Sequence, residues 1–207
     1  MKQINIVGKW IVLLIFLQCI LIGLEQIMFI LGITKLLLHQ VVIMAVMIVV
    51  SISMMIWGKK KKVGLGLFPP VFNKSYIVAT SLTCIVFILT PSNYSGDVEP
   101  LILLVYGSIV TPIFEETLFR GYIWRQIQEH FKSEKVALSI STLLFILWHI
   151  GYAISIYNRW GGNLWWGILM KISVATIYGG ILGGLRYKLK NCYACILVHG
   201  IMNAMGR

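Results

Sequence analysis

Apolar residues along this 207-residue chain fall into seven blocks, separated by short segments rich in polar, glycine or proline residues. A helix needs about 20 residues to cross the hydrocarbon core of a bilayer. In lipid the backbone must satisfy its own hydrogen bonds, which favours helices over an open sheet. The pattern therefore predicts an all-α fold, a polytopic membrane helix bundle that forms a single integral membrane domain over residues 1–207. The expected spans are approximately 10–31, 36–57, 75–90, 101–124, 136–157, 164–187 and 190–205.

Turn-forming and charged residues divide these spans. The clearest break combines four lysines at 59–62 with the glycines and the proline pair that follow them. The polar segment 91–100 is expected to be a loop, and the charged segment 125–135 is expected to be a connection between two spans. Residues 1–74 are expected to be N-terminal helices without an assigned role.

Composition supports the membrane class and excludes two others. Hydrophobic residues make up 58% of the chain and charged residues 12%, whereas soluble domains carry about 25% charged residues. The net charge of +11 could indicate a nucleic-acid partner, but the positive residues lie between apolar blocks, where they set membrane topology. We therefore expect the lipid bilayer as a partner and no nucleic acid.

The distribution of the positive residues predicts the orientation. If every span crosses, three of them fall on one side, namely Lys35, Arg159 and Arg207. Thirteen fall on the other side: Lys2, Lys9, the four lysines at 59–62, Lys74, Arg125, Lys132, Lys135, Arg186, Lys188 and Lys190. Because positive residues concentrate in cytoplasmic loops, a cytoplasmic N-terminus is expected. The small size and short loops favour a bacterial plasma membrane.

Ionisable residues inside the predicted spans are the candidate functional groups. Each costs about 2.5–3.5 kcal/mol at the centre of a membrane helix, so it needs a partner or a function. Glu116 and Arg120 are four residues apart and can pair on one helix face, whereas Glu115 points about 100° away. Two further ionisable residues in this half of the chain are histidines. They are His149 and His199.

Both histidines belong to four-residue spacings that place two side chains on one helix face. Phe145 precedes His149 by one turn, and Asn203 follows His199 by one turn. Gly200 would permit close helix approach. Taken singly, each element has a plain structural interpretation: a structural ion pair for Glu116 with Arg120, and an interhelical hydrogen bond for a histidine. Glu25 and Lys171 also lie in or near spans, and neither is assigned a role.

Together the three patterns EExxxR, FxxxH and HxxxN resemble the CAAX protease and bacteriocin-processing (CPBP/Abi) family, which includes CAAX prenyl endopeptidases and lysostaphin-resistance-like proteins. All three are complete here, at Glu115-Glu116-Arg120, Phe145-His149 and His199-Asn203. The resemblance covers residues 101–204 as a catalytic core. It implies an intramembrane endopeptidase that acts on membrane-associated peptides or proteins. Many members have eight helices, so an eighth, re-entrant segment is the alternative to seven spans.

The chemistry of the residues and the resemblance agree on the roles. Glu115 and His149 would activate a water molecule, and His199 with Asn203 would donate to the developing oxyanion. Glu116 and Arg120 would keep Glu115 correctly aimed, with Phe145 as further structural support of the site.

Three alternatives are weighed beside this interpretation. Glu115, His149 and His199 could instead ligate zinc, but an HExxH helix is missing, so a site without metal or other cofactor is preferred. A non-enzymatic bacteriocin-immunity or regulatory membrane protein would not need the complete set of motifs. A transporter is disfavoured because the chain shows no duplicated half.

Overall fold

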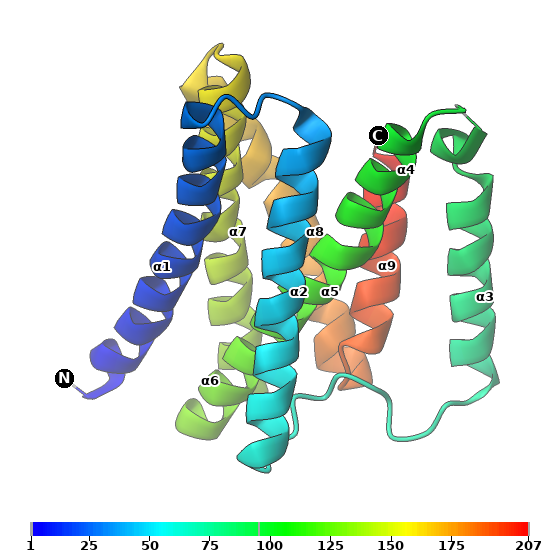
Figure 1. Ribbon diagram of the computed structural model, residues 1–207. Helices are drawn as coiled ribbons and strands as arrows, with labels where there is room; N and C mark the ends of the chain where they lie inside the picture. The colour runs from blue at the N-terminus through cyan, green and yellow to red at the C-terminus, as the bar shows by residue number, and fades with distance from the viewer. Residues whose placement is uncertain (1, 95, 207) are drawn as a thin grey trace.

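The computed structural model describes residues 2–94 and 96–206, and over these residues the chain is an all-α bundle (Figure 1). The prediction of a polytopic bundle of seven apolar helices is confirmed for this part of the chain, and an eighth apolar helix is not seen in it. Arg207, used above to predict orientation, lies outside the described residues. The seven helices are α1 (Lys2–Ile30), α2 (Leu36–Lys60), α3 (Lys74–Leu89), a continuous helix Val98–Phe131, α7 (Glu134–Trp160), α8 (Leu164–Leu189) and α9 (Tyr193–Met205).

The helices differ in length. Within the described residues, five are long and apolar enough to cross a membrane, while α3 and α9 have 16 and 13 residues. Helix α9 lies beside α8, and α3 stands at the edge of the bundle next to α9 (Figure 1). The α1–α2 and α7–α8 turns lie at the same end of the bundle, which we call the α7–α8 end.

The continuous helix Val98–Phe131 (the long helix) contains two π-helical segments. It consists of α4 (Val98–Val105), the π segment η2 (Tyr106–Val110), α5 (Thr111–Glu116), the π segment η3 (Thr117–Ile123) and α6 (Trp124–Phe131). Such segments are rare and are frequently found at functional sites. They flank α5, which carries the two adjacent glutamates.

The expectation that 125–135 is a connection is wrong for its first part, because the helix continues to Phe131. The charged residues there are accommodated on the helix surface: Arg125 pairs with Glu129 at 2.9 Å, and Gln128 donates to Glu134 at 3.1 Å. At 1.5 Å per residue the 34-residue helix is about 50 Å long, longer than the roughly 30 Å hydrocarbon core. The polar α6 can therefore extend beyond the hydrocarbon region.

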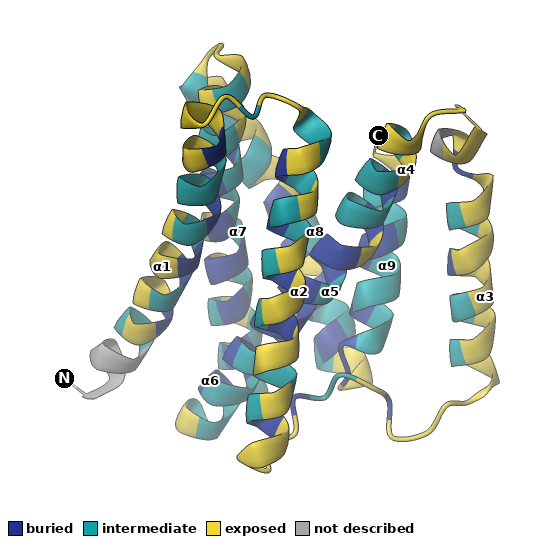
Figure 2. Cartoon of the chain, in the orientation of Figure 1, coloured by how far each residue is buried: buried dark blue, intermediate teal, exposed yellow. Residues whose placement is uncertain are grey.

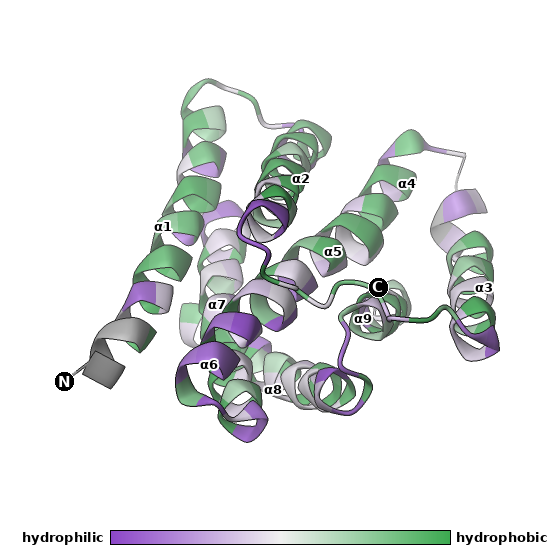
Figure 3. Cartoon of the chain, turned by 90° about the horizontal axis from the view of Figure 1, so that it is seen from below, coloured by the Kyte–Doolittle hydropathy of each residue, from purple (hydrophilic) through white to green (hydrophobic). Residues whose placement is uncertain are grey.

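Burial follows the pattern of a protein whose outer surface faces lipid. Large apolar side chains are exposed on the outside of the bundle, for example Ile30 at 81% and Trp165 at 80%, and the buried residues lie where the helices face one another (Figure 2). Hydrophilic residues gather around α6 and the adjacent helix ends, at the end opposite the α7–α8 end (Figure 3). Glu116 and Arg120, in contrast, are completely buried in the middle.

Candidate active site

Glu116 and Arg120 form a buried ion pair on consecutive turns of the long helix, as their spacing predicted. Arg120 Nη1 donates to Glu116 Oε1 at 3.2 Å, and both side chains are 0% exposed. The guanidinium carbon lies 4.1 Å from the centre of the Phe145 ring, and Nη2 is 3.5 Å from the carbonyl oxygen of Gly179. Arg120 thus connects the long helix with α7 and α8.

Glu115 points away from this pair and contacts α7. Its Oε1 accepts a hydrogen bond from the Tyr152 hydroxyl at 2.6 Å and another from Trp148 Nε1 at 3.2 Å. Its Oε2 accepts no hydrogen bond from the described residues, although the carboxylate is 1% exposed. One oxygen of Glu115 is therefore fixed by two donors, and the other has lone pairs free to accept from a bound molecule.

His199 of α9 lies between the two carboxylates. Its Nδ1 is 2.9 Å from Glu116 Oε1, a hydrogen bond in which the imidazole donates to the carboxylate. Its Nε2 is 3.8 Å from Glu115 Oε2, too long for a hydrogen bond. Glu116 thereby fixes the orientation of the ring so that Nε2 faces Glu115.

His149 is oriented by its own helix. Its Nδ1 lies 2.8 Å from the Phe145 carbonyl oxygen, which leaves Nε2 as the nitrogen without a backbone partner. The two rings, Phe145 and His149, are 4.5 Å apart. Within the described residues, no direct hydrogen bond joins His149 to Glu115. The structure therefore brings His199, rather than His149, closest to the Glu115 carboxylate.

Asn203 lies one turn beyond His199, where the long helix has its first π segment. Its Nδ2 donates to the Gly107 carbonyl oxygen at 2.7 Å. Pro112 has no N–H for the carbonyl of Ser108 four residues earlier, and a Cβ added to Gly200 would lie 2.6 Å from that oxygen. Glycine at position 200 therefore allows α9 to approach the long helix at this point.

Two contacts of the site were not predicted from the sequence. Trp148 and Tyr152, the donors to Glu115, lie on the same face of α7 as Phe145 and His149. Their spacing of three and four residues was a signal that could have identified them.

A polar cavity of about 270 Å³ lies beside these residues, towards the α7–α8 end. Two of its lining residues belong to the site: Tyr152, which holds Glu115, and Asn203. The cavity therefore offers space for a ligand one side chain away from Glu115, which does not itself line it. Its other lining residues are Glu25, Leu36, Gln40, Tyr106, Gly107, Thr111, Ser155, Ile156, Arg159, Trp160 and Lys171.

The alternative zinc ligands can be tested against this geometry. Within the described part of the chain, no three or more His, Cys, Asp or Glu side chains are grouped in a way that could hold a metal ion. Glu115, His149 and His199 therefore do not form a preassembled three-ligand site. The preference for a metal-free mechanism stays a prediction.

These features define a class, the membrane-embedded helical proteins with acid–base groups. The features are a buried carboxylate held by two donors, a histidine between two glutamates and an adjacent polar cavity. Residues 97–205, more than half of the chain, match the family described as type II CAAX prenyl endopeptidase Rce1-like. The chain belongs to this family, which confirms the resemblance inferred from the three motifs. It is by class an integral membrane protease that acts on membrane-associated substrates. No curated protein matches the chain, and no solved structure matches it.

Proposed function

We propose that this protein is an intramembrane endopeptidase in which Glu115 activates the attacking water. The observation that carries the proposal is the asymmetry of the Glu115 carboxylate. Tyr152 and Trp148 hold Oε1, while Oε2 faces His199 and accepts no hydrogen bond from the described residues. A carboxylate fixed in this way can accept a proton from water at one defined oxygen.

The reaction follows from ordinary acid–base chemistry. Water attacks the carbonyl carbon of the scissile peptide bond and gives one proton to Glu115, which forms a tetrahedral intermediate. The C–N bond then breaks, and the nitrogen takes the proton back from Glu115 as the amine leaves. The products are a new carboxylate and a new amine. Nε2 of His149 points away from its own backbone contact and orients the water.

His199 and Asn203 stabilise the developing oxyanion in this proposal. When His199 is doubly protonated, it donates from Nδ1 to Glu116 and presents Nε2–H towards the site. Asn203 keeps one amide hydrogen beyond the one it donates to Gly107. A single oxyanion donor is commonly worth about 3–4 kcal/mol.

Glu116, Arg120 and Phe145 position these groups rather than react. Glu116 orients His199, Arg120 supplies the countercharge, and Phe145 packs against both Arg120 and His149. The proposal includes no metal. We expect purified protein to keep most of its activity after strong chelation and dialysis. Loss of activity on chelation, with recovery on adding zinc, would show that a metal takes part.

We also propose that the N-terminus is cytoplasmic, in a bacterial plasma membrane, which places the α7–α8 end on the outer side. Reporter fusions at Asn93 and Lys132 should then read outside and inside, respectively. A cytoplasmic signal at Asn93 would contradict this orientation.

The proposed activity is tested in cells by comparing the membrane peptidomes of two strains. One expresses the wild-type protein and the other Glu115→Gln at the same level. New peptide termini that depend on Glu115 would support the proposal and identify the substrate. Identical peptidomes from equally folded proteins would contradict it.

A further inference from the structure

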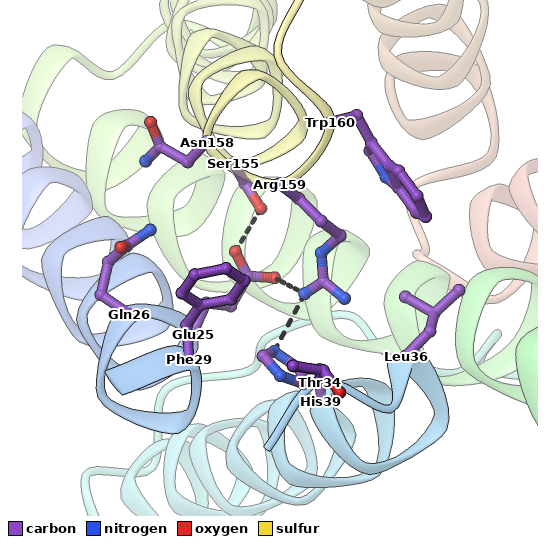
Figure 4. Close-up of a pocket in the computed structure, with 10 residues that line it drawn as sticks. All are labelled: Glu25, Gln26, Phe29, Thr34, Leu36, His39, Ser155, Asn158, Arg159 and Trp160. Carbon is purple, nitrogen blue, oxygen red and sulfur yellow. Dashed lines mark hydrogen bonds and ion pairs between the residues drawn. The ribbon is translucent and has the colours of Figure 1, made fainter. Parts of the chain in front are cut away.

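The polar cavity carries two cations, and one of them already has partners. Arg159 Nη2 lies 3.2 Å from Glu25 Oε1 and 3.1 Å from His39 Nδ1, and Glu25 also accepts from Ser155 (Figure 4). This cluster joins α1, α2 and α7 at the α7–α8 end. The charge of Arg159 is therefore balanced within the protein.

Lys171 is the other cation that lines the cavity, and its charge is not balanced in the same way. Across residues 2–94 and 96–206, no hydrogen bond or ion pair to its ammonium group is seen, although it lies within electrostatic range of His149. It is seven residues from the first residue of α8, about 10 Å along the helix axis. An ionisable group inside a membrane helix generally faces a polar cavity and has a partner or a function.

The cavity brings Lys171 close to one proposed catalytic residue, Asn203, whereas Glu115 does not itself line it. Tyr152 and Asn203 line the cavity together with Lys171, and Tyr152 holds Glu115. Its volume of about 270 Å³ has room for several water-sized groups, so part of a peptide segment can enter. A substrate whose scissile bond reaches Glu115 would then extend past Lys171.

We propose that Lys171 binds a carboxylate of the substrate, a few residues from the scissile bond, and so selects acidic or carboxyl-terminal segments. The proposal rests on the proposed peptidase function and adds a determinant of specificity to it. The carboxylate comes either from the chain terminus of the substrate or from an Asp or Glu side chain. Both present the same anion to the ammonium group, and the experiment below separates them.

The test measures binding in a Glu115→Gln background, which retains the cavity but is expected not to cleave. Three pools of synthetic hexapeptides with matched hydrophobicity are incubated with the purified protein, and retained peptides are quantified by mass spectrometry. The first pool has free C-terminal carboxyl groups and no Asp or Glu. The second has C-terminal amides and one acidic residue. The third has C-terminal amides and no acidic residue.

We expect the first or the second pool to be retained at least about tenfold over the third, since a hydrogen bond to a charged group contributes roughly that factor. The pool that is preferred identifies the source of the carboxylate. Adding Lys171→Met should remove the preference, whereas Lys171→Arg should keep most of it and show that the helix still folds. Lys35→Met, which removes an exposed positive charge at the same end of the bundle without lining the cavity, should leave it unchanged.

Equal retention of all three pools, or a preference that survives Lys171→Met, would overturn the proposal. The peptidase function is assessed separately by cleavage of the same pools with Glu115 present. Lys171-dependent binding without cleavage would reject the peptidase and keep the carboxylate site. Cleavage without any preference for peptides that carry a carboxylate would keep the peptidase function and reject the carboxylate site.

Discussion

Removing the charge of Glu116 is expected to destabilise the protein strongly, because it leaves a buried positive charge unpaired. In Glu116→Gln the buried guanidinium of Arg120 loses its countercharge, and the new amide can place N–H groups towards Arg120 and His199. Breaking a buried ion pair by removing one partner costs about 3–5 kcal/mol. Arg120 keeps its contacts with the Phe145 ring and the Gly179 carbonyl, so we expect the loss of stability to lie near the lower limit of this range.

A loss of about 3 kcal/mol corresponds to a fall in Tm of roughly 6–12 °C for a chain of this size. Thermal melts in detergent measure it, with Glu129→Gln as the matched control. Glu129 also forms an i,i+4 pair on the same helix, with Arg125 in the reverse order, but these side chains are 41% and 38% exposed. The control should change stability by less than about 1 kcal/mol. A double variant Glu116→Gln/Arg120→Met should melt above Glu116→Gln alone, because it leaves no unpaired buried charge. If Glu116→Gln melts together with Glu129→Gln, the buried pair does not have the role assigned to it.

Two further predictions concern contacts of the site. Tyr152→Phe removes the shorter of the two hydrogen bonds that hold Glu115. It should lower kcat by about tenfold or more with little change in the melting curve. An unchanged kcat would show that the bond does not position Glu115. Gly200→Ala places a Cβ 2.6 Å from the Ser108 carbonyl oxygen, which must force α9 away from the long helix. We expect less folded protein after purification. A normal yield with a normal Tm would contradict the close approach.

Much of the architecture could be predicted because it depends on local pattern. Apolar blocks determined the number of helices and their approximate ends. The pairing of Glu116 with Arg120 followed from a spacing of one helical turn. The end of the long helix was misplaced because a run of charged residues was taken for a connection, whereas Arg125 and Glu129 satisfy each other on the helix surface.

The remaining contacts depend on how helices rotate against one another, which the sequence pattern does not specify. Spacing could place Trp148 and Tyr152 on the same face of α7 as Phe145 and His149, but it could not show that Glu115 turns towards that face, because two π segments shift the side chains of the long helix around its axis. The proximity of Glu25 to Arg159 requires α1 to pack beside α7, although the two residues are 134 positions apart in sequence. The catalytic roles of Glu115, His149, His199 and Asn203 stay predictions.

The central claim is that Glu115 activates water rather than attacking the peptide itself. A single-turnover cleavage in water enriched in oxygen-18, with enzyme in excess over a peptide identified from the membrane peptidome, tests it most directly. If water attacks the peptide carbonyl, the new C-terminal carboxylate carries one oxygen-18 atom in the first turnover. If the product instead contains unlabelled oxygen and the label appears in Glu115, the glutamate acts as a nucleophile and the account is wrong.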